Sequence, residues 1–171
     1  MAFTVEDGTI VDDSNSFCSV EFADEYFSER SITAWTGDTS DKESALIRAT
    51  DYIEFRFAES FLGSKVESDQ SLSFPRTDID DVDEDQVPRA LKRATAEYAL
   101  RALSAELAPD PIATDTGRVG LVSESHKTGP IEDTYRYASR GAGLPPPPFR
   151  PYPAADALLN LLLRRSSGVL R

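Results

Sequence analysis

The sequence has one cysteine, one histidine and no long apolar run, and each shortage excludes a class of protein. Cys18 alone cannot form an intramolecular disulfide, which is typical of a protein from a reducing compartment. His126, as the only histidine, excludes most catalytic triads and histidine-rich metal sites. No segment approaches the ~20 consecutive apolar residues of a membrane-spanning helix, and no secretory signal begins the chain. We therefore expect a soluble protein made inside the cell, with no membrane partner.

Basic residues are also scarce. The chain has 18 Lys and Arg against 30 Asp and Glu, which gives a net charge of -12. A surface this acidic repels phosphate backbones, so nucleic-acid binding would require a segregated basic patch. The charge is uneven, because residues 139–171 contain five arginines and one aspartate, whereas residues 1–138 carry a net charge of -16. An acidic body with a basic tail favours a tail that docks onto an acidic partner.

The longest helical pattern runs from Asp85 to Leu107. Pro88 suits its first turn, and Pro109 ends the pattern. Apolar residues cover most of the circumference, so other elements must surround this helix. One charged stripe at i, i+4 spacing is expected to face solvent, and it consists of Arg93, Glu97 and Arg101.

Two earlier helices and a long anchored connection complete the predicted bundle. Helical patterns cover Val20–Arg30, capped by Ser19, and Asp41–Glu59, where Ser40 and Glu43 form a capping box. The connection that follows is predicted to be held on the bundle by buried residues. The expected core anchors are Phe74, Pro75, Leu91 and Tyr98.

The C-terminal third has a different character. Residues 118–126 and 131–137 alternate like the strands of a β-hairpin. A proline-rich stretch, residues 144–153, predicts an extended spacer before a leucine-rich helix at 154–165 that needs a surface to bury against. The expected fold class is mainly α, a small helical bundle with a β-hairpin and an extended Pro-rich C-terminal arm ending in a short helix. The expected boundaries are an N-terminal arm (1–18), a bundle core (19–111), a hairpin region (112–143) and a docking arm (144–171).

The sequence contains few patterns that are typical of a catalytic, metal-binding or nucleic-acid-binding site. The acidic run from Asp78 to Asp85 begins like a calcium-binding EF-hand loop at Asp81, but Gln86 and Lys92 occupy positions that require Gly and Glu. A solvated acidic loop explains the run better. A basic patch at Arg89, Lys92 and Arg93, and alternating Tyr and Arg at 135–140, are the weak signals for nucleic acid. We expect no enzyme activity, no metal and no cofactor.

Several segments together resemble a known family. They are SFCSVEFADEYFSER, SDKESALIRATDYIEFRF, QSLSFPRTDI, VPRALKRATAEYALRAL, KTGPIEDTYRY and AADALLNLLL. They resemble small phage proteins labelled DnaT-like single-stranded DNA-binding proteins, which are similar to the head–tail connector, or adaptor, proteins of long-tailed phages. The most specific parts are LSFPR at 72–76 and the helix start at 87–94. Phe74 stands where a Trp is expected, and this exchange keeps an apolar anchor.

The resemblance implies a structural virion protein at the phage neck, made in the cytoplasm of the bacterial host. Such an adaptor forms a homo-oligomeric ring, twelve-fold in this expectation, beneath the portal protein. A tail-side connector or tail-terminator protein adjoins it, and packaged double-stranded DNA passes through without tight binding. The acidic residues expected to face the channel are Asp78, Asp80, Asp81, Asp83 and Glu84. The residues expected to dock on the portal are Pro151, Tyr152, Leu158, Leu159, Leu162, Leu163, Arg164, Arg165 and Arg171.

Two alternatives remain open at this point. The family label implies a single-stranded DNA-binding protein of replication, which must show salt-dependent affinity. An acidic regulator that mimics DNA would instead form a tight complex with a basic enzyme.

Overall fold

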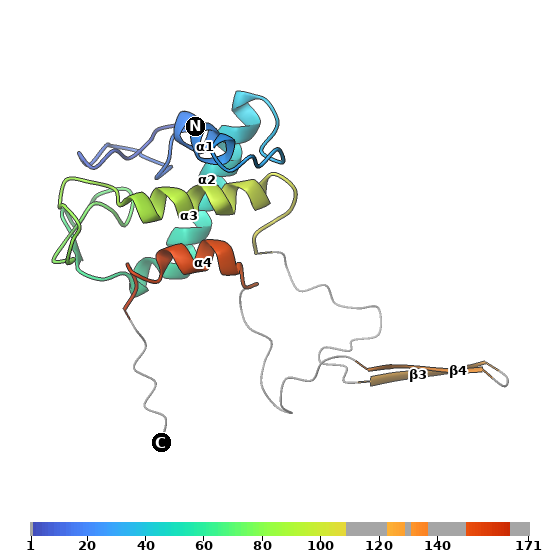
Figure 1. Ribbon diagram of the computed structural model, residues 1–171. Helices are drawn as coiled ribbons and strands as arrows, with labels where there is room; N and C mark the ends of the chain where they lie inside the picture. Colours follow the sequence, from blue (N-terminus) through green and yellow to red (C-terminus); the bar gives the residue numbers. More distant parts are fainter. Residues whose placement is uncertain (1, 109–122, 129–130, 137–149, 165–171) are drawn as a thin grey trace, which may run out of the picture. The chain divides into compact units, whose positions relative to one another are not determined.

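The computed structural model describes residues 2–108, 123–128, 131–136 and 150–164 (Figure 1). Met1–Leu107 and Pro151–Arg171 form one compact unit, and Ala108–Arg150 form a second unit inserted between them. The first unit contains α1 (Val20–Ser28), α2 (Thr39–Phe57), the 3-10 turn η1 (Ala58–Ser60), β1 (Ser64–Lys65), β2 (Arg76–Thr77), α3 (Arg89–Ala102) and α4 (Pro153–Leu159). The second contains β3 (Ser123–Thr128) and β4 (Ile131–Arg136). The prediction of a mainly α fold with a small β-hairpin is confirmed.

Helix α3 is the centre of the first unit. α1 and α4 lie on opposite sides of it, and α2 crosses it (Figure 1). Leu91, Ala94 and Tyr98 of α3 are fully buried, and its alanines allow the neighbouring helices to approach closely. The helix is shorter than the pattern from Asp85 to Leu107, because Pro88 before it has extended backbone angles.

The helix starts follow ordinary capping chemistry. Ser19 caps α1, since its side chain accepts a hydrogen bond from the Phe22 N–H at 3.2 Å. The predicted cap of α2 at Ser40 is wrong. Asp38 performs this role, accepting from the Asp41 N–H at 2.9 Å. Asp38 has the extended backbone that a cap requires, whereas Ser40 already lies inside the helix.

The charged stripe of α3 does not face solvent as a whole. Glu97 is only 9% exposed. Its carboxylate accepts hydrogen bonds from the Tyr26 hydroxyl of α1 at 3.0 Å and from the Arg101 guanidinium at 2.8 Å. Such bonds replace water and make burial of a charged group tolerable. The solvent-facing prediction is therefore wrong for Glu97, because α1 covers this part of the helix.

The long connection between α2 and α3 is anchored by aromatic packing. Phe74 is fully buried and meets Phe17 and Phe61 edge-on, with ring centroids 6.3 and 5.0 Å apart. Arg76 donates to the main-chain oxygens of residues 62 and 63 at 2.7 and 2.9 Å, beside the antiparallel β1–β2 pair. The four expected core anchors, Phe74, Pro75, Leu91 and Tyr98, are all buried in this unit.

The N-terminal arm is folded back on one buried carboxylate. Glu6 accepts hydrogen bonds from the main-chain N–H groups of Gly8, Ile10 and Val11 and from the Ser14 hydroxyl, at 2.9 to 3.2 Å. Gly8 has φ +113°, and a Cβ atom there would lie 2.0 Å from the Asp85 carbonyl oxygen. The arm therefore contacts the end of the acidic run, and only glycine allows this approach.

In the second unit, β3 and β4 pair antiparallel from Ser123↔Arg136 to Thr128↔Ile131. The hairpin prediction is confirmed for these residues. The predicted strand residues 118–122, the turn at 129–130 and the proline run up to residue 149 lie outside the described residues.

Candidate interaction surfaces

The C-terminal segment belongs to the core of the first unit. Helix α4 lies along α3, and Leu159 and Leu162 are buried there. After α4, the chain runs antiparallel to residues 60–62, with Phe61 paired to Leu163 and the Arg164 N–H bonded to the Ser60 oxygen at 2.8 Å. The leucine-rich helix was predicted to need a surface to bury against, and α3 of its own bundle provides that surface.

The residues that were expected to dock on the portal differ in how deeply they are buried. Tyr152, Leu159 and Leu162 contribute to the protein's own core and are not available to a partner. The physical reason is that a cluster of leucines fills a groove on its own bundle as readily as on another protein. The others divide into Pro151 and Arg164, which are exposed, Leu158 and Leu163, which are half-buried, and Arg165 and Arg171, which lie outside the described residues.

A polar cluster fixes α4 to the two long helices. Arg56 of α2 forms a two-pronged ion pair with Asp156, with N–O distances of 2.9 and 3.2 Å. The Tyr98 hydroxyl of α3 and the Tyr152 main-chain N–H also donate to this carboxylate. Burial, and then the hydrogen bond to Asp156, hold the pKa of Tyr98 far above its ordinary value.

Tyr152 also bonds to the end of the chain segment that contains α3. Its hydroxyl donates to the Leu107 carbonyl oxygen at 2.9 Å, and Leu107 is buried. Leu107 is the last residue before the second unit in the sequence, and Tyr152 is the second residue after it. Both residues belong to the first unit, where this hydrogen bond joins them. No sequence pattern indicated this contact.

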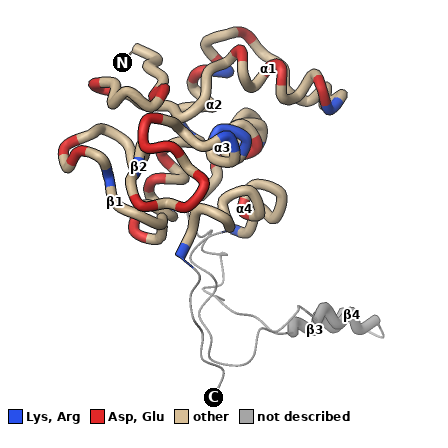
Figure 2. The backbone as a smooth tube through the Cα atoms, turned by 60° about the vertical axis from the view of Figure 1, so that its left-hand side comes forward, with Lys and Arg blue, Asp and Glu red and all other residues tan. Residues whose placement is uncertain are grey.

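The acidic loop, residues 78–85, is the most strongly charged surface segment among the described residues. It turns around the buried Ile79, with backbone hydrogen bonds from Val82 to Ile79 and from Gln86 to Asp83. Asp78 and Asp81 have φ near +60°, a conformation that aspartate tolerates better than most residues. Figure 2 shows the loop as a red run beside α3. Its exposed acidic side chains are Asp78, Asp80, Asp81, Asp83, Glu84 and Asp85.

The predicted basic patch lies at the start of α3, next to this loop (Figure 2). Arg89 is exposed, whereas Lys92 and Arg93 are half-buried. Of the alternating Tyr and Arg run at 135–140, residues 137–140 lie outside the described residues, and Tyr135 and Arg136 belong to the second unit. The described residues therefore present a small cationic patch beside a larger anionic segment.

One groove opens between the acidic loop, the start of α3 and the end of α4. Its volume is about 450 Å³. Leu161 is one of its lining residues and is 79% exposed. We call it the acidic groove. Its apolar lining is Ile79, Val82, Pro88, Ala90, Leu161 and Leu162, and its polar lining is Asp80, Asp81, Asp83, Gln86 and Arg89.

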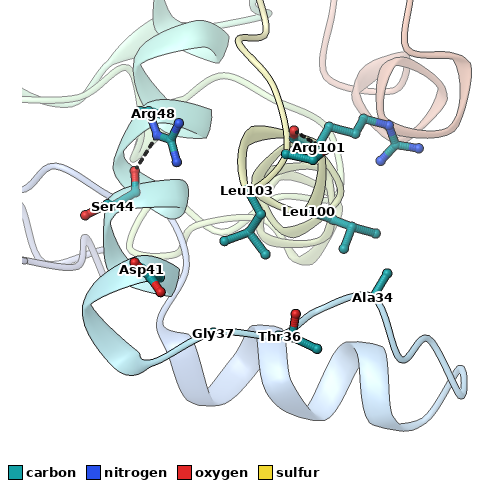
Figure 3. Close-up of a pocket in the computed structure, with 10 residues that line it drawn as sticks. Ala34, Thr36, Gly37, Asp41, Ser44, Arg48, Leu100, Arg101 and Leu103 are labelled. Carbon is teal, nitrogen blue, oxygen red and sulfur yellow. Dashed lines mark hydrogen bonds between the residues drawn. The ribbon is translucent and has the colours of Figure 1, made fainter.

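A second groove, of about 730 Å³, lies between α2, α3 and the connector before α2 (Figure 3). Leu100 and Leu103 extend from α3 on the side that faces this connector. Arg48 donates to the Ser44 carbonyl oxygen at 3.2 Å, whereas Arg101 extends away from Arg48 and pairs with Glu97. The two cations do not converge, so the groove offers no paired-arginine site for a phosphate.

The described residues hold no group of three or more His, Cys, Asp or Glu positioned for a metal ion. Cys18 is buried, and this desolvation raises its pKa to about 12, which makes the thiol unreactive at neutral pH. No described helix is long and apolar enough to cross a membrane.

Comparison with protein-family profiles finds a match over residues 1–171 to the family described as "Putative DnaT-like ssDNA binding protein". The chain belongs to this family. Membership agrees with the part of the sequence resemblance that concerns DnaT-like proteins, and the profile does not mention head–tail connectors. Comparisons with curated proteins and with solved structures found no match.

Proposed function

We propose that this DnaT-like family member is a structural virion protein, a subunit of the head–tail adaptor ring of a tailed phage. The observation that carries the proposal is the charge of the first unit. Residues 2–108 contain 24 Asp and Glu against 10 Lys and Arg. An acidic surface of this kind suits the wall of a channel, because DNA must slide past it without being held.

Half of the ten cations in residues 2–108 are, moreover, already engaged with other groups of the protein. Four of the ten in residues 2–108 form ion pairs with carboxylates, and they are Arg30, Lys42, Arg56 and Arg101. Arg76 is buried and bonded to main-chain oxygens. DNA affinity from counterion release needs several cations that converge on phosphates. Few exposed cations remain for that purpose in the described part of the first unit.

The sequence resemblance supplies the remaining support. Its two most specific elements, LSFPR and the start of α3, form the anchor and the centre of the first unit. The resemblance therefore involves the framework of the fold. The ring, the portal as its neighbour and the place at the virion neck rest on this resemblance, since no family profile or solved structure supplies them.

Single-stranded DNA binding is the second candidate, and the family description favours it directly. Arg89, Lys92 and Arg93 would be its contact residues in the described part of the chain. Against it, the acidic loop borders this patch, so carboxylates would repel a strand that approaches it.

Titration of a labelled single-stranded oligonucleotide with the full chain, at physiological ionic strength, separates the two candidates. The adaptor proposal predicts no binding in the micromolar range. A replication protein would bind and weaken steeply as salt increases. In that case Arg89→Glu should abolish binding, while Arg48→Glu, which removes an exposed cation on α2, should leave it nearly unchanged.

A further inference from the structure

The acidic groove combines negative charge with an exposed apolar side chain. Asp80, Asp81 and Asp83 line it with negative charge, and Arg89 is the one cation among its lining residues. Leu161, which also lines it, exposes 79% of its surface. An apolar strip framed by carboxylates fits a peptide that carries both aliphatic and cationic side chains.

The chain itself contains a peptide of this composition. Residues 165–171 read RSSGVLR, with two arginines, a Val-Leu pair and no acidic side chain. They belong to the net-basic part of an otherwise acidic sequence. Charge complementarity therefore points to the chain's own C-terminal tail as the occupant of the groove.

We propose that the acidic groove binds residues 165–171 of a second copy of this chain. The path of the chain favours a second copy over the tail of the same molecule. After Leu162, which lines the groove, the chain pairs with Ser60 and Phe61, and neither of these lines the groove. Leu163 and Arg164, the last described residues before the tail, therefore do not line the groove.

Such a contact joins a groove on one copy to a tail on the next. Contacts of this head-to-tail type build rings when the rotation between copies closes, and filaments when it does not. The proposal goes beyond the proposed function, because it would hold for a self-associating protein of either candidate class.

The test uses two full-length variants with opposite charge reversals. The groove variant carries Asp80→Arg and Asp83→Arg, which leave the left-handed Asp78 and Asp81 in place. The tail variant carries Arg165→Glu and Arg171→Glu. The wild-type chain should self-associate in sedimentation and native mass spectrometry, more weakly at high salt. Each variant alone should associate about 100-fold more weakly or worse, because like charges then meet.

Mixing the variants gives the decisive result. The groove variant keeps a normal tail and the tail variant keeps a normal groove, and the reversed groove and the reversed tail also carry opposite charges. The mixture should therefore regain association, in assemblies that contain the two variants in equal numbers. Glu67→Arg with Asp69→Arg, two exposed acidic residues outside the groove, is the matched control and should associate like wild type. Circular dichroism of every variant establishes that it is folded. A wild-type chain that stays monomeric, variants that still associate alone, or a mixture that does not regain association would each overturn the proposal.

Discussion

Leu159 and Leu161 form a matched pair that tests whether α4 belongs to the core. Both are leucines at the end of the C-terminal segment, two positions apart, yet Leu159 is 0% exposed and Leu161 is 79% exposed. Replacing each with alanine removes the same atoms from opposite environments. If the segment stood free as a docking arm, neither substitution would affect the folding of an isolated chain.

The structure predicts that the two substitutions change the free energy of unfolding by very different amounts. Leu159→Ala should reduce the free energy of unfolding by about 2–5 kcal/mol, the range for fully buried leucines, because it removes apolar contact and leaves a cavity. Leu161→Ala should change it by less than about 0.5 kcal/mol, as exposed substitutions usually do. For a chain of this size the first change lowers the melting temperature by about 4–20 °C.

Urea unfolding followed by circular dichroism measures both values under the same conditions. Comparable m-values for the three proteins would show that the comparison concerns stability alone. Equal and small effects of the two substitutions would refute the placement of α4 in the core. A large effect of Leu161→Ala would refute the exposed position of that side chain.

Three further predictions concern other parts of the first unit. Phe74→Ala should cost about 3–5 kcal/mol in urea unfolding, since the ring is fully buried; an unchanged midpoint would mean that the connection is anchored elsewhere. A double-mutant cycle of Arg56→Leu and Asp156→Ala should give a coupling energy of about 0.5–3 kcal/mol, since the two groups share an ion pair; additive effects would exclude the pair in solution. Cys18 should resist alkylation at pH 8 in the folded chain and react on unfolding, because its pKa is raised to about 12; rapid labelling of the native protein would contradict its burial.

The local elements of this fold could be predicted because their signals are short-range. Capping at Ser19, the helical period of α2 and α3, and the alternation of the hairpin each depend on residues close in sequence. Phe74 and Pro75 were recognisable as an anchor because an apolar pair inside a long polar connection has few other uses.

The predictions that were wrong depend on contacts between residues that are far apart in the sequence. Glu97 is buried because Tyr26, distant in the sequence, donates to it, and no local pattern encodes that bond. The leucine-rich pattern of α4 predicts that the helix is buried, but it does not show which surface covers the helix. The acidic groove likewise depends on the meeting of the acidic loop with Leu161, which tertiary packing alone determines.

The composition of finished particles tests the proposed function most directly. Under the proposed function a tailed phage encodes this chain. Quantitative mass spectrometry of the purified virions of that phage would give the copy number of the chain relative to the portal protein, with a replication protein of the same phage as the marker for contamination. An adaptor ring predicts the chain in every purified particle, in copies comparable to those of the portal. A chain abundant in infected cells but depleted from virions to the level of the replication protein would contradict the structural role and favour DNA binding.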